Sequence, residues 1–396
     1  RSAKSIDLSD EIRALLRFPK AHATPAELIT AILKAQVDLL FFGGIGTYVR
    51  ASGETDAQVG DRANDAVRIA AADLGAKVVG EGANLGMTQR SRIEAARRGV
   101  KLNTDAIDNS AGVNTSDVEV NIKIALALPL ERGDLSAPDR AALLKEMTDE
   151  VGALVLRNNY LQTLALSLAE HKGADDLAFQ QRLMQMLEAR GELDRAVEFL
   201  PSDAEIADRR SRGEHLTRPE LAVLLAYAKL ALDQDLVASN VPDDAYLSGE
   251  LVNYFPREIK ERYPHAIETH RLHREIIATG LSNAIVNQGG PSCLARIADQ
   301  TGADAPAIAR AFAAVRDSYH VPELNAAIDA LDTKVPGAVQ LGLYAAVQDL
   351  VVGRTIWFLG NVSFADGIAG VVERYRTGIA AVAAVLEESL PEAWRR

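Results

Sequence analysis

The residues whose types and spacing could do chemistry are concentrated in a glycine-rich segment, residues 76–119. Gly80, Gly82 and Gly86 follow a short apolar run, and a stretch with helical spacing and a basic end comes next. A glycine turn between a strand and a helix lets backbone N–H groups approach a ligand, and the helix dipole there favours negative charge. This segment therefore predicts a nucleotide-binding part of the chain.

The turn from Gly80 to Gly86 also has the form of a loose dinucleotide fingerprint. Asp105 stands about 20 residues beyond the first glycines, where an acid that binds the ribose is expected. A turn with a purely structural role explains the same glycines, so from the residues alone both interpretations stay open.

A second candidate lies at the end of the segment, where Ser116 and Glu119 form a Ser-x-x-Glu capping box. A plain helix cap is one interpretation, and a helix N-terminus whose hydroxyl holds a substrate carboxylate is another. Apolar and polar residues alternate from 118 to 124, which is instead typical of a strand. We favour a helix here, because the sequence beyond it has many helical stretches.

Histidine and cysteine provide no further site. His265, His270 and His273 lie in one stretch with helical spacing, where the last two would share a face. Metal ligation needs donors that this stretch lacks, so we expect polar surface or interface roles. Cys293 has no recognisable partner base and is expected to be a packed thiol. We find no nucleophile-elbow, zincin or Walker motif, and we assign no catalytic residue and no metal ligand.

Two glycine turns each follow a strand that must position them. Residues 37–42 form a continuous apolar run, as expected of a strand covered on both faces. Gly43, Gly44 and Gly46 follow it at once, as Gly80–Gly86 follows the second strand. Two such strands indicate parallel βα units, whose ligands lie at the carboxyl ends of the strands. Before them, Thr24 and Pro25 mark the start of a helix.

Beyond about residue 126 the sequence changes character and becomes helical. Strand-like runs are few, and capping and turn signals separate long stretches with helical spacing. The architecture predicted from the residues is a small α/β part followed by a large all-helical part. The main helical stretches are residues 139–172, 175–190, 204–212, 219–235, 266–287, 305–318, 338–359 and 368–388.

Length and composition exclude several classes of protein. The 396 residues are 48% hydrophobic and 25% charged, as in a globular protein of two or three domains. A net charge of −12 argues against a general nucleic-acid binder. One cysteine excludes a disulfide framework and favours a reducing compartment. No apolar run reaches the roughly 18 residues of a membrane span. We expect a cytoplasmic protein with neither nucleic acid nor membrane as partner.

Several motifs closely resemble those of the large-subunit NAD-specific glutamate dehydrogenases of bacteria. They are GGIGTYV at 43–49, VGDRAND at 59–65, VGEGANLG at 79–86 and DNSAGV at 108–113, followed by Ser116-Asp117 and EVNIK at 119–123. RNNY at 157–160, residues 216–230 and REIIAT at 274–279 resemble the helical C-terminal region of the same family. The resemblance covers nearly the whole chain.

The resemblance implies a fold, an activity and a cofactor. Residues 1–127 would be the end of a Rossmann-like NAD-binding domain, an α/β remnant, and residues 128–396 a large all-α domain. The activity would be oxidative deamination of L-glutamate to 2-oxoglutarate and ammonia in amino-acid catabolism, with hydride passing to NAD. The residues alone do not decide between NAD and NADP. A homo-oligomer is expected.

The resemblance also implies roles for individual residues. Cofactor-binding roles fall on Gly43, Gly44, Ile45, Gly82, Asn84 and Asn109. The two asparagines would contact the nicotinamide end of the cofactor, and Ser116 would hydrogen-bond the side-chain carboxylate of glutamate. Asp105 would then be no ribose ligand. Phe42 stands where the family pattern leads us to expect Asn, which weakens any polar contact there.

The family's catalytic lysine and aspartate, and its dinucleotide fingerprint, match nothing in this chain and are expected upstream of Arg1. The chain also lacks an initiator Met. We therefore expect the C-terminal part of a larger enzyme, inactive alone, whose partner is the remainder of its own polypeptide. Two alternatives stay open: another amino-acid dehydrogenase of the same superfamily, and a non-catalytic helical module for assembly or regulation.

Overall fold

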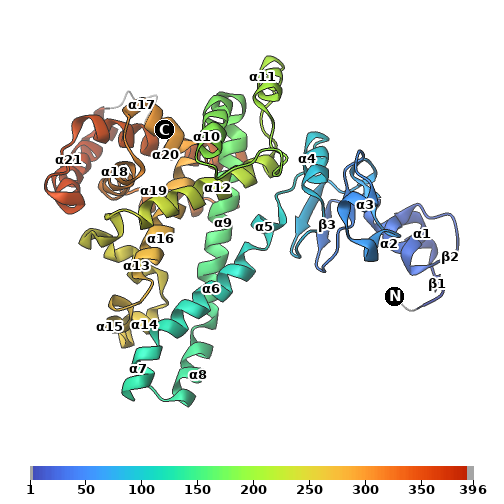
Figure 1. Cartoon of the computed structure of the whole chain (residues 1–396), viewed down its shortest axis with the longest axis horizontal. Helices are drawn as coiled ribbons and strands as arrows, with labels where there is room; N and C mark the ends of the chain where they lie inside the picture. Colours follow the sequence, from blue (N-terminus) through green and yellow to red (C-terminus); the bar gives the residue numbers. More distant parts are fainter. Residues whose placement is uncertain (1–2, 390–396) are drawn as a thin grey trace. The chain divides into compact units, whose positions relative to one another are not determined.

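The structure is a computed structural model that describes residues 3–389 (Figure 1). By its internal contacts the chain divides into two compact units, and the division falls within three helices. Unit 1 comprises the chain up to Asp117, Gly152–Leu166 and Asp194–Leu224. Unit 2 comprises Val118–Val151, Ser167–Leu193 and the chain from Leu225. The domain boundary after residue 127 stays a prediction.

Unit 1 contains all the strands of the described chain, each short, with helices between them (Figure 1). The strands are β1 (Ile6–Asp7), β2 (His22–Ala23), β3 (Leu39–Phe42), β4 (Val49–Arg50), β5 (Ile69–Ala70) and β6 (Val78–Glu81). The helices lying wholly in this unit are α1 (Asp10–Leu16), α2 (Pro25–Leu33), α3 (Asp56–Val59), α4 (Gln89–Arg97), α5 (Asp105–Asp108) and α11 (Asp203–Ser211), with short 3-10 helices at Arg62–Asn64 and Ala71–Asp73.

The strands pair in twos. β3 and β6 are parallel, with Leu39 opposite Val78 and Phe42 opposite Glu81. β4 and β5 are also parallel, whereas β1 and β2 are antiparallel. Isolated bridges extend the parallel pattern from Val78 to Lys101 and from Val49 to Met87. The sequence-based prediction that these two strands are parallel is confirmed.

Helix α2 shows why the helix boundaries of unit 1 follow local sequence. The Thr24 hydroxyl accepts a hydrogen bond from Glu27 N, and the Glu27 carboxylate accepts one from Thr24 N at 2.9 Å. Pro25 takes the first helical position, where its missing N–H costs nothing. Leu33 packs into the core of the unit, and the predicted start of this helix is confirmed.

One face of the β3–β6 pair is buried, and the side chains of the other face are exposed. Phe42 and Val79 point into the core and are 6% and 3% exposed. On the opposite face Leu39, Phe41 and Val78 are 57%, 63% and 40% exposed. The prediction of a strand covered on both faces is therefore wrong for the described residues, because these three side chains remain substantially exposed.

Unit 2 is entirely helical (Figure 1). Its helices are α6 (Ser110–Ala125), α7 (Ala127–Arg132), α8 (Ala137–Glu146), α9 (Thr148–Lys172), α10 (Leu177–Ala189), α12 (Arg218–Val237), α13 (Ser248–Tyr254), α14 (Arg257–Arg262), α15 (Pro264–Glu268), α16 (His273–Gly289), α17 (Cys293–Thr301), α18 (Ala305–Ser318), α19 (Val321–Asp329), α20 (Gly337–Asn361) and α21 (Gly367–Ser389), of which α6, α9 and α12 continue into unit 1. Further 3-10 helices lie at Gly173–Asp176, Val241–Asp243 and Ala245–Leu247. The prediction of a large helical part is confirmed.

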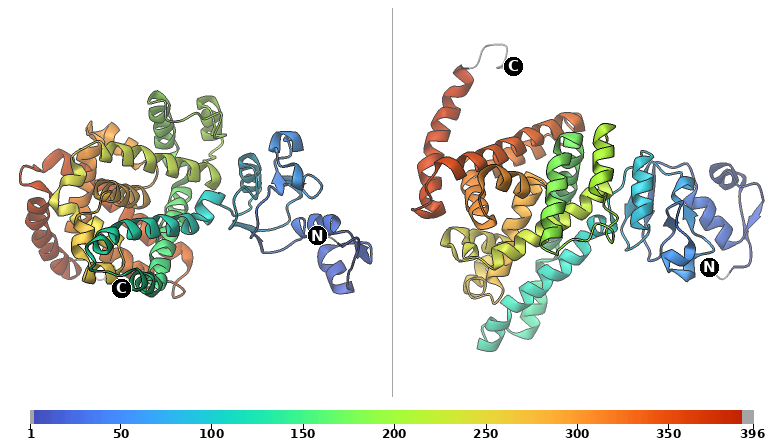
Figure 2. Two further views of the ribbon diagram at one scale, coloured as in Figure 1. Left: turned by 60° about the horizontal axis from the view of Figure 1, so that its bottom comes forward. Right: turned by 45° about the horizontal axis from the view of Figure 1, so that its top comes forward.

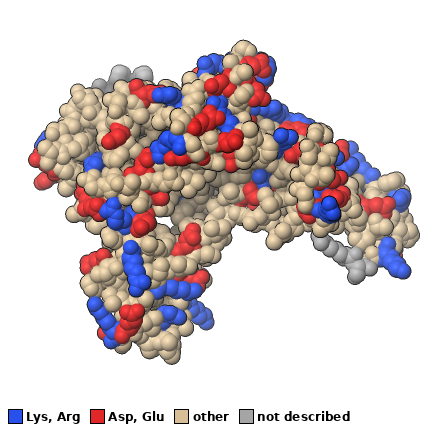
Figure 3. Space-filling view, in the orientation of Figure 1, with Lys and Arg blue, Asp and Glu red and all other residues tan. Residues whose placement is uncertain are grey.

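The core of unit 2 forms where α18 packs against α20 and α21. Ile308, Phe312 and Val315 of α18 are almost completely buried, as are Val351 and Phe358 of α20. Within residues 3–389 no helix is both long enough and apolar enough to cross a membrane. On the face shown in Figure 3, basic and acidic side chains are interspersed rather than gathered into a patch of one sign.

Candidate functional site

Two loops leave the same edge of the parallel pair β3–β6. The first follows Phe42 and carries Gly43, Gly44 and Ile45, and the second follows Glu81 and carries Gly82 and Asn84. Ala83 N donates to Phe42 O at 3.0 Å and Tyr48 N donates to Gly86 O at 2.9 Å, so the loops are tied to each other. The structure therefore brings together the loops that carry most of the predicted cofactor-binding residues.

The two predicted nicotinamide-contacting residues are in direct contact. Asn109 Nδ2 donates a hydrogen bond to Asn84 Oδ1. Asn84 is exposed at the carboxyl edge of β6, and Asn109 is a half-buried residue at the turn between α5 and α6. Residues 25 positions apart thus present their amide groups together, and each amide retains donors and acceptors that a ligand can use.

A buried network of charged side chains anchors the second loop, which follows Glu81. Arg92 of α4 bonds both carboxylate oxygens of Glu81, at 2.7 and 2.9 Å, and its Nη2 lies 3.1 Å from Asp105 Oδ1. Glu81 also accepts from Met87 N at 3.0 Å, and Asp105 accepts from Leu85 N at 2.8 Å. The network therefore anchors both the start and the end of the Gly82–Gly86 turn.

Glu81 and Arg92 are 1% and 4% exposed, so their charges depend on each other. Burial raises the pKa of the Glu81 carboxyl, and the Arg92 guanidinium opposes that shift. A buried carboxylate that holds a bidentate arginine and a backbone N–H is well satisfied, whereas one without the arginine would be strongly unfavourable. We infer that the pair maintains the shape of the loop rather than exchanging protons.

The loop after β6 does not offer a set of unengaged backbone N–H groups for binding phosphate. Three of its backbone N–H groups, those of Ala83, Leu85 and Met87, already donate to groups of the chain. Leu85 adopts a positive φ of 58°, and the Asp105 carboxylate stabilises it there. Both oxygens of Asp105 have partners, since Oδ1 also accepts from Ala106 N at 2.9 Å. These contacts oppose the interpretation of residues 80–86 as a dinucleotide fingerprint with Asp105 on the ribose.

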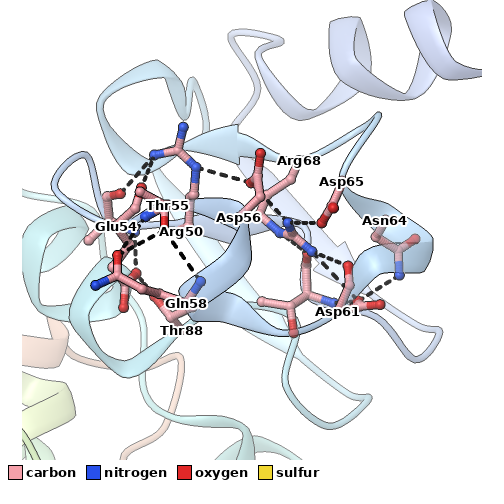
Figure 4. Close-up of polar contacts among 12 residues, drawn as sticks. Arg50, Glu54, Thr55, Asp56, Gln58, Asp61, Asn64, Asp65, Arg68 and Thr88 are labelled. Atoms are coloured by element: carbon pink, nitrogen blue, oxygen red, sulfur yellow. Dashed lines mark hydrogen bonds and ion pairs between the residues drawn. The ribbon is translucent and has the colours of Figure 1, made fainter.

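The first loop is held by the VGDRAND motif, which sequence reasoning did not connect to it. Asp61 Oδ2 accepts from Thr47 N at 2.9 Å and from Asn64 Nδ2 at 2.7 Å (Figure 4). Gly46 has φ 138°, and a Cβ there would lie 2.6 Å from Asn64 Nδ2. The Arg68 side chain is fully buried, and its Nε donates to Thr47 O at 2.9 Å.

Arg68 ties the surrounding segment together (Figure 4). Its Nη1 bonds Asp56 at 2.9 Å and Asp65 at 2.6 Å, and its Nη2 donates to Asp61 O at 2.5 Å. Hydrogen bonds from Arg68 and from Thr47 N lower the pKa values of Asp56 and Asp61, respectively. Residues 56–68, which include the motif, therefore support the loop that precedes β4.

The residues at the tip of the first loop are open to ligands. Gly43, Gly44 and Ile45 are exposed, and Ile45 is 86% exposed. A groove of about 290 Å³ runs beside the two glycines. Its walls are Ile29, Ile32, Leu33, Leu40, Phe41, Phe42 and Tyr48. The rings of Phe42 and Tyr48 are stacked, with centroids 5.8 Å apart, so the departure from Asn at position 42 places an aromatic ring in the core of the loop.

Helices α9 and α12 support the turn that carries Asn109. Asn159 of α9 donates to Ile107 O at 2.7 Å and to Ser110 Oγ at 2.9 Å. Arg218, at the start of α12, bonds Asn103 Oδ1 and donates to Thr163 O at 2.9 Å. The RNNY motif thus helps to hold the candidate site, although it lies far along the sequence.

Ser116 does not begin a helix. It is exposed in the interior of α6, which starts at Ser110 and follows α5 almost without interruption. The predicted capping box is wrong, since the helix that contains Ser116 already begins at Ser110. The strand interpretation of residues 118–124 is also wrong, because buried Val118 and Ile122 lie four positions apart on one face of the helix.

The three histidines are not on one helix. α15 ends at Glu268 and α16 begins at His273, so His270 lies in the connection. His270 is 2% exposed, and its Nε2 lies 3.0 Å from Asn121 O while its Nδ1 accepts from Leu272 N. These partners favour the neutral ring, and burial lowers the pKa of His270. The expected surface role is therefore wrong for this histidine.

Cys293 is a packed thiol, as predicted. It is 2% exposed, and burial raises the pKa of its thiol to about 12. Among residues 3–389, no three or more His, Cys, Asp or Glu side chains are arranged to hold a metal ion.

Comparison with known proteins identifies the family of the chain. A family model described as "Bacterial NAD-glutamate dehydrogenase, catalytic domain" matches residues 1–169, and one described as "Glutamate dehydrogenase, C-terminal" matches residues 213–396. The chain belongs to the bacterial NAD-glutamate dehydrogenase family. The candidate site lies within the part matched by the catalytic-domain model.

Curated relatives named "NAD-specific glutamate dehydrogenase" are similar over most of this chain. That of Pseudomonas aeruginosa is 48% identical over 98% of the chain and 24% of the relative. That of Halomonas elongata is 48% identical over 91% of the chain and 22% of the relative. That of Mycobacterium tuberculosis is 44% identical over 76% of the chain and 19% of the relative. The chain thus spans about a fifth to a quarter of the length of these relatives.

Proposed function

We propose that this chain contributes to the NAD-dependent oxidative deamination of L-glutamate to 2-oxoglutarate and ammonia in a longer protein. The contact between Asn84 and Asn109 at the carboxyl edge of β3–β6 is the observation that carries the proposal. Ligands of open parallel sheets bind at this edge. Family membership suggests the reaction, and the contact between the two amides supports the proposal because one ligand could reach both.

The residues present fit the nicotinamide end of NAD. The Asn84 and Asn109 amides can each donate to and accept from a carboxamide, and neither amide is fully used by their mutual hydrogen bond. Gly43 and Gly44 leave the neighbouring surface without side chains, and a Cβ on Gly44 would meet no atom within 4 Å. NAD, when bound, would accept the hydride from the substrate carbon.

The other predicted roles have uneven support. The exposed backbone of Gly43, Gly44 and Ile45 is compatible with a wall of the cofactor cleft. Gly82 lies under the Phe41 ring, where a Cβ would come within 2.4 Å of that ring, so it permits the close packing of the loop. Ser116 retains a substrate-binding role only through the resemblance, since the helix-cap argument no longer applies.

We further propose that β3 and β6 are the last parallel strands of a Rossmann-like domain, together with the short segment at Lys101 that bridges to β6. Their parallel pairing and the glycine turns at their carboxyl ends support this. A site for the cofactor phosphates would then lie in another part of the longer protein, because the turn after β6 has its N–H groups engaged. Under this proposal the helices beyond α6 serve assembly or regulation, except that α9 and α12 also support the turn that carries Asn109.

The test uses the full-length protein with Asn84→Ala and, separately, Asn109→Ala. Each substitution removes hydrogen bonds to the cofactor, so we expect the KM for NAD to rise about tenfold. Glutamate-dependent NADH formation gives the KM, and quenching of protein fluorescence by NADH gives the affinity independently. Asn253→Ala is the matched control, because Asn253 is an exposed asparagine of α13.

Unchanged KM and NADH affinity in both variants would rule out the proposed cofactor contacts. A full-length protein that reduces NAD with an apolar amino acid but not with glutamate would instead favour the alternative dehydrogenase. Complete absence of NAD reduction with every amino acid would leave the assembly or regulatory module as the function.

A further inference from the structure

Helix α20 is apolar on both sides. Its 25 residues include only two charged side chains, Asp349 and Arg354. One face packs into unit 2 through six buried residues: Tyr344, Gln348, Val351, Val352, Thr355 and Phe358. Figure 2, right, shows this helix in orange-red as a long helix along one side of the helical unit. A helix with a single buried face normally carries charged residues on the other.

The opposite face of α20 carries a regular stripe, here named the α20 seam, which is exposed except at half-buried Leu350. Its members recur at alternating intervals of four and three residues: Val339, Leu343, Ala346, Leu350, Gly353, Trp357 and Gly360. Val339, Leu343 and Trp357 are 52%, 40% and 42% exposed. A Cβ on Gly353 or Gly360 would meet no atom within 4 Å, so the helix surface is open there.

The spacing of the seam is that of a coiled-coil interface. Apolar residues every 3.5 positions are the a and d positions of a heptad, which face a partner helix. If Leu343, Leu350 and Trp357 are a positions, the buried residues fall at b, c and f, on the side away from a partner. Small residues at Ala346, Gly353 and Gly360 let a second backbone approach closely. An exposed apolar stripe of this length marks an interaction site.

The two charges of α20 indicate the partner. In the same heptad Asp349 is a g position and Arg354 is the e position five residues later. In a parallel pair of helices, a g residue of one helix lies beside the following e residue of the other. Two copies of α20 would therefore place Asp349 of each copy beside Arg354 of the other. The seam is self-complementary in charge as well as in shape.

The charges are accessible for such pairing. Asp349 Oδ1 lies 3.1 Å from Lys172 Nζ, but its side chain is 67% exposed and can accept a second cation. Arg354 is exposed on the same side of the helix.

We propose that a second copy of this chain docks on the α20 seam, with the two α20 helices side by side and parallel. The inference is independent of the proposed cofactor site, since it rests on residues of unit 2 alone. The two-fold axis runs along the seam, so the contact is closed and yields a dimer.

Disulfide trapping tests the contact directly in the 396-residue chain. Ala346→Cys places a thiol at a d position on the axis, where it would face its counterpart in the second copy. The native Cys293 is buried and does not compete. Under mild oxidation we expect most Ala346→Cys chains to form covalent dimers. Thr377→Cys, exposed on α21, is the control and should remain monomeric.

A charge exchange tests the partner and the orientation. Arg354→Asp turns both interhelical pairs into repulsions, so we expect the dimer dissociation constant to rise on the order of tenfold. Asp349→Arg alone should do the same. An equimolar mixture of the two variants should restore the original constant, because each attractive pair re-forms in the mixed dimer. Light scattering after size-exclusion chromatography gives the masses, and circular dichroism verifies that each variant is folded.

Three results would overturn the proposal. The unmodified chain could be monomeric at concentrations on the order of 100 µM, which would assign the seam to another part of the longer protein. Thr377→Cys could crosslink as fast as Ala346→Cys, which would show random collision. A folded Arg354→Asp variant could dimerise unchanged, which would exclude the parallel pairing.

Discussion

The Lys229 side chain of α12 is half-buried, and its amine is partly desolvated. Burial lowers the pKa of Lys229 to about 7, whereas a lysine in an unfolded chain titrates near 10.4. Between about pH 7 and pH 10 the unfolded chain therefore holds a proton that the folded chain has lost. The free energy of unfolding should therefore rise with pH across this window. Below about pH 7 the amine is charged in the folded chain as well, so burial of that charge destabilises the fold to its full extent.

Replacing Lys229 with Met should remove this dependence. We expect the Lys229→Met variant to gain about 2 kcal/mol of stability at pH 6 and much less at pH 10, because only the charged amine is costly to bury. Urea unfolding at both pH values measures the difference. Lys334→Met, which changes an exposed lysine, should have no such effect. An equal gain at both pH values would contradict the argument.

At the residue level, sequence alone predicted the site only in part. Glycines and asparagines in the loops stand out, because turns and family motifs constrain them individually. The residues that hold the loops in place cannot be recognised in the same way. Glu81, Arg92 and Asp105 contact one another only after β6, α4 and α5 have packed together. The prediction for Ser116 failed for a different reason. A Ser-x-x-Glu pattern inside a long helix has the same sequence as a capping box at a helix start.

At the scale of elements, the Glu81–Arg92 pair joins β6 to α4, and Asp105 adds α5. Arg92→Met should lower the free energy of unfolding by about 3 kcal/mol, because it leaves the Glu81 charge buried without a partner. Chemical denaturation of the 396-residue chain measures this loss.

The double variant Glu81→Gln with Arg92→Met distinguishes charge from packing. It leaves no buried charge, so part of the lost stability should return. If the double variant were as unstable as the sum of the two single variants, the two side chains would act independently and their proposed coupling would be wrong.

Element boundaries were predictable where local signals agree with packing. The helix expected at residues 305–318 is α18, because Asp304 caps it and Pro306 enters its first turn. The stretch at 266–287 was expected as one helix but is α15 and α16, since buried His270 turns the chain between them. The contact of His270 with Asn121 is non-local, and spacing alone could not reveal it.

At the scale of the whole molecule, the activity should depend on residues of the longer protein that this chain does not contain. We expect no glutamate-dependent NADH formation from the 396-residue chain, because the resemblance leads us to expect the acid–base lysine upstream of Arg1, and proton transfer would then lack its donor. The full-length protein should be active in the same assay. Activity of the short chain would show that the catalytic groups lie among its own residues.

The exposed apolar face of β3 and β6 has a consequence for the behaviour of the isolated chain in solution. Leu39, Phe41 and Val78 form an uncovered apolar surface beside the free edge of a short parallel sheet. Surfaces of this kind recruit other strands and promote aggregation. The chain expressed by itself should therefore bind hydrophobic dyes, and polar substitutions at Leu39 or Phe41 should weaken that binding.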